Sequence, residues 1–259
     1  MNKNAVISIS NLKMKYSEEY VLKGIDLQIS PGQIISYIGP NGAGKTTTIK
    51  VLLGMIDDFE GKVEIFGQEI TGGDIEYKKK IGYVPEGGQL YETLTGQEYI
   101  EFIGKIYGLE DNVVSSRGQK MVELFGFDKA LNDRISSYSK GMKQKLLIVT
   151  ALIHNPEIII LDEPLNGLDA NSVLVFKEVL SKLAKAGKTI FYSSHLMDVV
   201  EKISNRIVLI FEGKIIADGT FEELQKLSEK GSLEGIFNEL TGFHEHEQIA
   251  EKIIAALEN

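Results

Sequence analysis

A glycine-rich segment that ends in a lysine and a threonine carries the strongest chemical signal in the sequence. Residues 39–46 read GPNGAGKT, which fits the pattern G-x-x-x-x-G-K-[ST]. Glycines let backbone N–H groups surround phosphate oxygens, and a following helix adds its positive N-terminal end. Lys45 is then placed to reach the β- and γ-phosphates of a nucleotide, and the Thr46 hydroxyl to ligate Mg²⁺. The predicted nucleotide contacts here are Gly39, Pro40, Asn41, Gly42, Ala43, Gly44, Lys45, Thr46 and Thr47.

Two adjacent carboxylates follow a continuously apolar run. Residues 158–161 read IIIL, typical of a buried parallel strand, and Asp162 and Glu163 come directly after them. In an open parallel sheet, ligands bind at the carboxyl ends of the strands. We therefore expect Asp162 to join the Mg²⁺ shell and Glu163 to polarise an attacking water, as general base or as positioner. A strand that ends in solvated acids is the alternative, and the phosphate-binding segment favours the functional interpretation.

The elements that must position these residues alternate along the chain. Short apolar or alternating runs predict strands at residues 5–12, 21–29, 34–38, 62–66, 81–84, 158–161, 188–193, 206–211 and 214–217. Helical periodicity predicts helices at residues 46–53, 95–108, 112–126, 140–154, 171–186 and 196–203. Strands that alternate with helices indicate an α/β domain with parallel units, and the helices near 90–155 indicate an insertion.

Composition excludes several classes of protein. The chain has 259 residues, a formal net charge of −9 and no cysteine, which excludes disulfides, Cys-ligated metals and a Cys nucleophile. An acidic surface repels phosphate backbones, so we expect no nucleic-acid partner. The first ten residues, MNKNAVISIS, lack the apolar core of a signal peptide, and no apolar run approaches the roughly 20 residues of a spanning helix. We expect a chain that is soluble by itself.

Further segments discriminate among nucleotide-binding families. These segments are Tyr16, 29 positions before Lys45; Glu86 after 81–85 (IGYVP); residues 138–144 (YSKGMKQ); residues 166–169 (NGLD); and residues 193–195 (SSH). Together, in this order, they resemble the ATP-binding subunits of ABC transporters over about residues 5–225. In that resemblance YSKGMKQ is similar to the family signature, NGLD to the D-loop and SSH to the switch histidine.

The resemblance implies roles for these residues. Tyr16 is expected to stack on adenine, although a half-buried tyrosine at a strand end is the alternative. Ser139 and the Gly141 amide, at a helix N-terminus, are expected to bind a γ-phosphate, and an N-cap serine is compatible with this. His195 is expected to hydrogen-bond the γ-phosphate and hold the water. Glu86 is expected to approach nucleotide-bound Mg²⁺. Asp169 completes the expected nucleotide contacts.

The sequence departs from the family pattern at several positions. Lys140 replaces the first signature glycine, Met142 replaces the glutamine, Glu86 replaces the glutamine of the Q-loop, and Asn166 replaces a serine or alanine. Lys140 places a positive charge near phosphate or points to solvent. Glutamate in the Q-loop and a Ser-x-Gly-Met signature resemble the ATPase subunits of ABC-2-type exporters.

The resemblance also implies architecture and partners. The expected fold is α/β, a P-loop NTPase (RecA-like) core with an antiparallel β subdomain and a helical insertion subdomain. Residues 1–225 form the expected ABC ATPase domain, with the helical part at about 90–155, and residues 226–259 form a helical tail. The expected cofactors are ATP and Mg²⁺. The expected partners are a transmembrane permease and a second ATPase subunit, in a homodimer on the cytoplasmic face of the membrane, with Lys45, Glu163 and His195 as catalytic residues.

Two other classes of function stay open. A soluble ABC ATPase that acts on ribosomes or DNA usually carries two cassettes or a coiled-coil insertion, and this chain shows neither. The second alternative is a regulatory module that holds ATP without hydrolysis. The presence of Lys45, Asp162, Glu163 and His195 argues against it.

In the tail, residues 237–242 (FNELTG) are similar to the ends of exporter ATPases. His244 and His246 suggest a metal, but residues two apart do not share a helix face, which favours a solvated tail.

Overall fold

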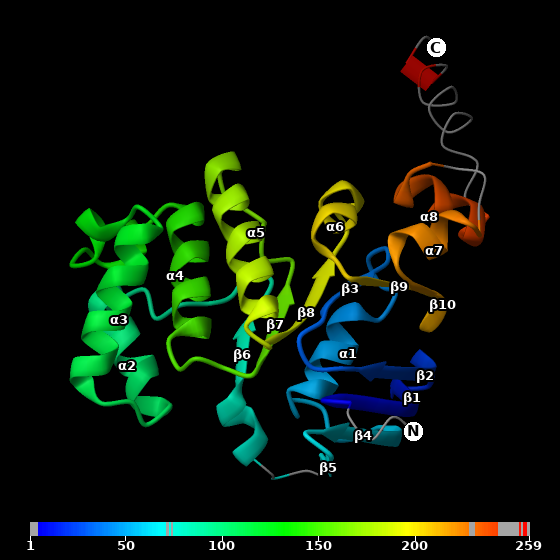
Figure 1. The fold of residues 1–259 in the computed structure, drawn as a ribbon, viewed down its shortest axis with the longest axis horizontal. Helices are drawn as coiled ribbons and strands as arrows, with labels where there is room; N and C mark the ends of the chain where they lie inside the picture. Colours follow the sequence, from blue (N-terminus) through cyan, green and yellow to red (C-terminus); the bar gives the residue numbers. More distant parts are fainter. Residues whose placement is uncertain are drawn as a thin grey trace.

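The computed structural model describes residues 5–70, 73, 75–227, 231–242, 254 and 256–257. One part of the architecture is a four-stranded antiparallel sheet in the order β2-β1-β4-β5 (Figure 1). Its strands are β1 (Ile7–Tyr16), β2 (Glu19–Ile29), β4 (Glu60–Ile65) and β5 (Gln68–Glu69).

The larger sheet has six strands in the order β10-β9-β3-β8-β7-β6. All neighbours in it are parallel except β9 and β10, which form an antiparallel hairpin at one edge. The predicted α/β class with an antiparallel β subdomain is confirmed. The strands of the larger sheet are β3 (Ile34–Ile38), β6 (Ile81–Val84), β7 (Ile158–Asp162), β8 (Thr189–Ser194), β9 (Arg206–Phe211) and β10 (Lys214–Gly219).

One helix and the antiparallel sheet cover one face of the larger sheet, other helices cover the opposite face, and a separate helical unit lies beside β6 (Figure 1). That unit is inserted between β6 and β7 and comprises α2 (Gly96–Ile106), α3 (Asp111–Leu124) and α4 (Lys140–Leu152). The remaining α-helices are α1 (Lys45–Leu52), α5 (Ala170–Lys185), α6 (Met197–Ile203), α7 (Phe221–Gln225) and α8 (Leu233–Thr241). Short 3₁₀ helices cover Glu76–Lys80, Asp128–Ala130 and Ile135–Ser137.

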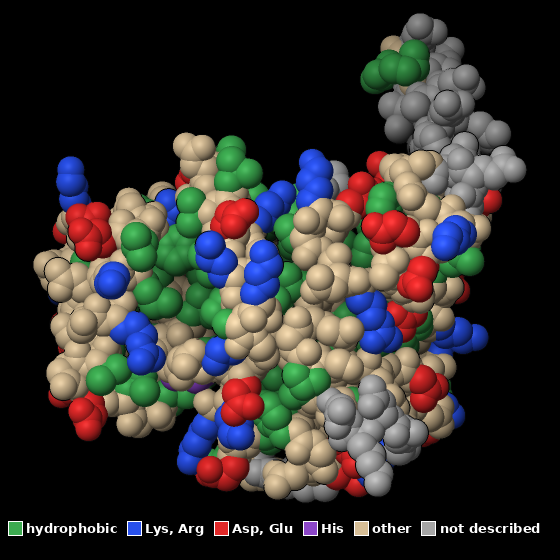
Figure 2. All heavy atoms as spheres, viewed as in Figure 1, with side chains coloured by type: hydrophobic (Ala, Val, Ile, Leu, Met, Phe, Trp, Pro, Cys, Tyr) green, Lys and Arg blue, Asp and Glu red, His purple; other side chains and the backbone are tan. Residues whose placement is uncertain are grey.

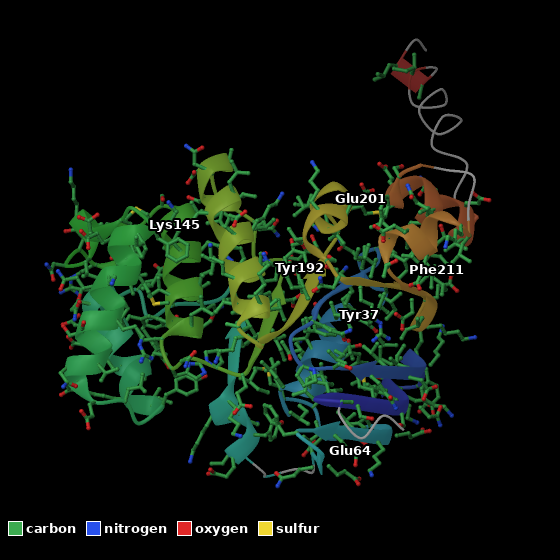
Figure 3. All side chains as sticks on the ribbon, viewed as in Figure 1. Tyr37, Glu64, Lys145, Tyr192, Glu201 and Phe211 are labelled. Atoms are coloured by element: carbon green, nitrogen blue, oxygen red, sulfur yellow. The ribbon has the colours of Figure 1, made fainter. Side chains whose placement is uncertain are left out.

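Two hydrophobic clusters cover the two faces of the larger sheet. One joins α1 and the antiparallel sheet to the face that carries Tyr37, and the other joins α4, α5, α6 and α8 to the face that carries Tyr192 (Figure 3). A third cluster holds the helical unit together. Apolar side chains gather on the surface between α4 and α5 (Figure 2), where a pocket of about 340 Å³ is lined by Leu152, Val179 and Leu183 among others.

Most predicted elements coincide with observed ones, and β1 shows why one boundary differs. The alternation of apolar and polar residues predicts a strand at 5–12, whereas β1 continues to Tyr16. Asn11 adopts a positive φ of 49°, its N–H donates to Asp26, and the pairing register shifts after Ile9. A bulge of this kind changes which face each later side chain occupies, so the period-two pattern is lost although the strand continues.

The helical unit is anchored to the start of β6 by two aromatic rings. Tyr107 and His154 stack with centroids 3.6 Å apart, and the Tyr107 hydroxyl and His154 Nε2 lie 3.3 Å and 3.1 Å from the Ile81 carbonyl oxygen. Burial lowers the pKa of His154 to about 4, so the ring is neutral near pH 7. Because the Ile81 carbonyl oxygen can only accept, Nε2 carries the proton and is the donor. His154 lies two residues beyond the end of α4, so this end of the helix is held against the sheet.

The C-terminal helices pack on the core. Leu233, Ile236 and Phe237 of α8 are buried, and the Phe237 ring meets Phe211 of β9 edge-on at 6.2 Å. Glu201 of α6 accepts a hydrogen bond from the Leu233 N–H (Figure 3). His244 and His246 lie outside the described residues.

None of the described helices has both the length and the apolar character that crossing a membrane requires.

Gly82 in β6 provides a test of how closely α4 and β6 pack. A Cβ at Gly82 would lie 2.2 Å from the backbone carbonyl oxygen of Ala151. We predict that Gly82→Ala lowers the free energy of unfolding by about 1–3 kcal/mol, because backbone must move to relieve the overlap. Urea unfolding followed by circular dichroism measures this. Gly231→Ala, where no atom lies within 4 Å of the added Cβ, is the matched control, and equal stability of both variants would contradict the prediction.

Candidate functional site

The glycine-rich segment joins the end of β3 to the start of α1. Gly44 precedes α1 with a φ of 107°, a conformation that glycine adopts without the strain that other residues incur. Glycine has no side chain to cap the helix, and the first-turn N–H groups of a helix lack intrahelical acceptors. Ala43 N–H donates to the Pro40 carbonyl at 3.2 Å, which closes the loop. The loop therefore presents a helix N-terminus to an anion.

Lys45 is folded back onto the loop that precedes it. Its Nζ donates to the carbonyl oxygens of Gly39 at 2.7 Å and Pro40 at 3.3 Å. Burial lowers the pKa of the Lys45 amine, while the negative charges of Glu163, Asp162 and Glu86 act in the opposite direction. The three carboxylates around the lysine stabilise its charged form, which is the form that binds phosphate.

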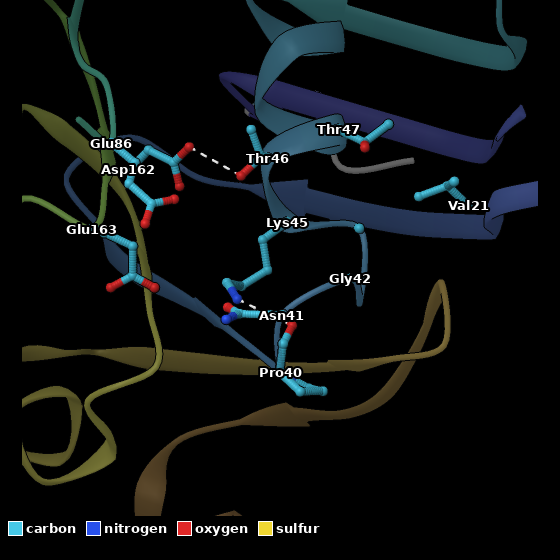
Figure 4. Close-up of a pocket in the computed structure, with 11 residues that line it drawn as sticks. Val21, Pro40, Asn41, Gly42, Lys45, Thr46, Thr47, Glu86, Asp162 and Glu163 are labelled. Atoms are coloured by element: carbon cyan, nitrogen blue, oxygen red, sulfur yellow. Dashed lines mark hydrogen bonds between the residues drawn. The ribbon is translucent and has the colours of Figure 1, made fainter. Parts of the chain in front are cut away.

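Asp162 is a buried carboxylate whose two oxygens both have partners. The Thr46 hydroxyl donates to Oδ2 at 3.2 Å (Figure 4). The Ser193 hydroxyl donates to Oδ1 at 2.5 Å. Asp162 and Ser193 are register partners in the parallel strands β7 and β8. The carboxyl ends of β7 and β8 thus bring an acid, and α1 brings a hydroxyl, to the same point.

Glu163 turns away from the strand with an unusual backbone conformation. Its φ is 49°, a left-handed value that is rare for residues other than glycine and that often marks functional sites. Its side chain is 5% exposed, Oε1 lies 2.9 Å from His195 Nδ1, and the Ser194 hydroxyl donates to Oε2 at 3.5 Å. A carboxylate oxygen can only accept a hydrogen bond, so His195 Nδ1 carries the proton and donates it to Glu163 Oε1. This hydrogen bond fixes the orientation of the Glu163 carboxylate.

These residues converge on one pocket of about 290 Å³ (Figure 4). Glu86, which follows β6, joins Asp162 and Glu163 in its wall opposite Lys45. Val21 of β2 also lines it, and no local pattern predicts this because the strand belongs to the other sheet. The pocket is lined by Val21, Pro40, Asn41, Gly42, Gly44, Lys45, Thr46, Thr47, Glu86, Asp162 and Glu163.

Other predicted site residues do not line this pocket. Tyr16 lies at the end of β1 and is 49% exposed. Ser139 caps α4, accepting a hydrogen bond from the Met142 N–H at 3.2 Å, and Gly141 lies in the first turn of the same helix. Asp169 caps α5, and hydrogen bonds from Ser172 hold the pKa of its carboxyl well below the usual range. Within one chain, the signature segment is therefore separate from the pocket that Lys45 lines.

Two further residues that support the site were not among the predicted site residues. Ser193, quoted only as part of a motif, holds the buried Asp162, and the alignment of strand ends was the signal that could have found it. Gln144 is buried on α4, and its Nε2 donates to the Pro164 carbonyl at 2.9 Å. No local pattern reveals that contact, because the two residues lie 20 positions apart on different elements.

Comparison with known proteins gives a consistent result. A family model described as ABC transporter matches residues 22–166. The chain is 36% identical over 219 residues to the linearmycin resistance ATP-binding protein LnrL of Bacillus subtilis, covering 85% of this chain and 70% of the relative. It is 32% identical over 220 residues to the Nod factor export ATP-binding protein I of Cupriavidus metallidurans, covering 85% of this chain and 73% of the relative.

A solved structure agrees at the level of the fold. The structure described as the ATP binding subunit of an ABC transporter superposes with a TM-score of 0.85 at 30% identity. The match covers 91% of this chain and 99% of that chain.

The expected role of Tyr16 can be tested directly. If its ring stacks on adenine, Tyr16→Ala should weaken nucleotide binding by about tenfold, since stacking of a base on an aromatic ring contributes about 1–3 kcal/mol. Binding of a fluorescent ATP analogue measures the affinity. Tyr20→Ala is the matched control, because Tyr20 is a similarly exposed tyrosine of the same hairpin whose hydroxyl bonds Glu60. If the affinity of the Tyr16→Ala variant for nucleotide is unchanged, Tyr16 does not stack on adenine and is a surface tyrosine at a strand end.

Proposed function

Because this chain belongs to the ABC transporter family and is an ATP-binding subunit, we propose that it hydrolyses ATP to drive a membrane permease. The observation that carries this proposal is the convergence of Lys45, Thr46, Asp162 and Glu163 on one pocket. A module that held ATP without hydrolysis would have no use for the buried, oriented carboxylate of Glu163. The intact set therefore favours an enzyme.

The residues beside the phosphate loop fit a magnesium ion. The Thr46 hydroxyl and the Asp162 carboxylate, 3.2 Å apart, offer the hard oxygen ligands that Mg²⁺ prefers, and Glu86 adds a carboxylate in the same wall. Among the described residues, no group of three or more His, Cys, Asp or Glu is arranged to hold a metal by itself. Mg²⁺ is therefore expected with its nucleotide, where it neutralises charge on the phosphates.

Glu163 is the proposed general base. Its carboxylate is shielded from water and oriented by His195 and Ser194, so it can accept the proton of the water that attacks the γ-phosphate. Lys45, released from the Gly39 and Pro40 carbonyls, binds the phosphates instead. In this state His195 contacts Glu163, and we propose that its other ring nitrogen reaches the γ-phosphate when the nucleotide is present.

The position of the signature segment favours a dimer. Ser139 and Gly141 do not line the pocket that holds Lys45, so one chain does not complete the site. We propose that two copies associate head to tail, with the α4 N-terminus of one copy facing the phosphate loop of the other. Each of two ATP molecules is then enclosed between chains.

A membrane permease follows from the family, and export is the proposed direction. The name of one relative states Nod factor export, and residues Glu86 and Met142 resemble the exporter subgroup. We place the chain at the cytoplasmic face of the membrane, bound to the permease through the helical unit beside Glu86. A ribosome- or DNA-directed ATPase is disfavoured, because the net charge is −9 and basic and acidic side chains are interspersed over the face in Figure 2.

The base can be tested by one substitution. We predict that Glu163→Gln lowers the rate of ATP hydrolysis by at least ~10²-fold, because the amide cannot accept the proton, while ATP still binds. Phosphate release measures turnover, and equilibrium binding measures affinity. Glu123→Gln, an exposed carboxylate of α3, is the control that keeps full activity. Full turnover of the Glu163 variant would remove Glu163 from the mechanism.

The dimer can be tested with the same variant. With ATP and Mg²⁺ present and hydrolysis blocked, Glu163→Gln should sediment as a dimer, and without nucleotide as a monomer. Lys45→Ala should stay monomeric in both conditions, because it lacks the phosphate contact. A monomer at high protein concentration with saturating ATP would contradict the two-chain site.

A further inference from the structure

The loop between β7 and α5 rests on the first two turns of α4. Gln144 donates to the Pro164 carbonyl at 2.9 Å, and Lys145 pairs with Asp169 at 3.4 Å between Nζ and Oδ2. Figure 3 labels Lys145 on α4. The beginning and the end of loop 164–169 are thus both held by polar side chains of one helix.

The middle of the loop is held differently, by close approach of the helix. A Cβ at Gly141 would lie 2.8 Å from the Gly167 carbonyl oxygen, so backbone meets backbone there. A Cβ at Gly167 would lie 2.9, 3.1 and 3.2 Å from Cγ, Cδ and Cε of Lys140. The aliphatic part of Lys140 therefore lies along the bare Cα of Gly167, whose φ of 87° depends on glycine.

A lysine at this place is not explained by the stability of α4. Lys140 is the first residue of the helix, where a positive charge opposes the helix dipole. Unlike Lys145, its ammonium makes no ion pair with a described residue. The interaction that the structure does give it is the packing of its methylene groups on Gly167.

The loop leads directly to the proposed base. Asn166 N–H donates to the Glu163 carbonyl at 3.2 Å, and Leu168 N–H donates to the Leu165 carbonyl at 3.1 Å. Displacement of Gly167 is therefore transmitted through two adjacent turns to the backbone of Glu163. That backbone already has a left-handed conformation, which persists only where the surroundings impose it.

We propose that Lys140 is a positioning residue: its methylene chain holds Gly167 against α4, and through loop 164–169 it maintains the orientation of Glu163. This inference rests on the proposed function of Glu163 as base. It assigns the role to the aliphatic stem of Lys140 and not to its charge. Lys140→Met keeps an unbranched stem without the charge, Lys140→Arg keeps a stem with the charge, and Lys140→Ala removes both.

Hydrogen exchange of the nucleotide-free chain tests the packing without any assay of activity. In Lys140→Ala, the amides of Asn166 and Leu168, which both donate hydrogen bonds within the loop, should exchange about fivefold faster, because local opening becomes easier. In Lys140→Met they should exchange within about twofold of the natural chain. Lys143→Ala is the control, since Lys143 pairs with Glu92 and not with this loop. Equal exchange in the Lys140→Ala variant and the natural chain would overturn the proposal.

Steady-state ATP hydrolysis then separates the stem from the charge. Lys140→Ala should lower kcat about tenfold with KM for ATP unchanged, because a displaced base slows the chemical step. Lys140→Met should restore kcat. If Lys140→Met is as slow as Lys140→Ala while Lys140→Arg is active, the charge acts and the proposal is wrong.

The two hypotheses fail differently. If Glu163→Gln keeps full turnover, the proposed function of Glu163 is wrong whatever the exchange rates show. If Glu163→Gln is inactive but Lys140→Ala hydrolyses ATP at the natural rate, Glu163 stays the base and the positioning role of Lys140 is wrong.

Discussion

The buried carboxylate of Asp162 is the constraint on which the site depends. A charge that is 1% exposed is tolerated when hydrogen bonds compensate its lost hydration, and here Thr46 and Ser193 supply them. Those partners come from α1 and β8, so the same interaction fixes the helix after the phosphate loop against the ends of two strands. The parallel register of β7 and β8 makes this geometry possible. Removal of either hydroxyl leaves part of a buried charge uncompensated.

Local sequence patterns predict most of the features that are formed by residues close together in the chain. The phosphate loop, the Asp162–Glu163 pair and the strand and helix order follow from motifs and periodicity, and the structure brings Lys45, Thr46 and Asp162 together. Contacts between distant elements do not follow. The Gln144 bond to Pro164 and the packing of Lys140 on Gly167 depend on how α4 lies beside the loop after β7. The bulge at Asn11 hides the end of β1 for a related reason, since it changes the period of the pattern.

The structure shows what surrounds two of the residues that depart from the family pattern. Glu86 stands in the pocket wall with two other carboxylates, so the charge of Lys45 is balanced by more negative groups than a glutamine would provide. Lys140 occupies a position where the family has glycine, and Gly167 opposite it leaves the space its stem fills. A residue that looks unfavourable in its own helix is thus accommodated by a neighbour 27 positions later in the chain.

The contacts near the two ends of α4 restrict how this helix can move against the sheet. A helix of 13 residues is about 20 Å long and resists bending. Beyond its last turn, His154 is fastened to the Ile81 carbonyl at the start of β6, and its first turns are fastened to the loop that follows β7. α4 is thus attached near its end to β6 and near its start to the loop after β7, and these two strands are neighbours in the sheet. The helical unit therefore cannot slide along the sheet unless one of these attachments breaks.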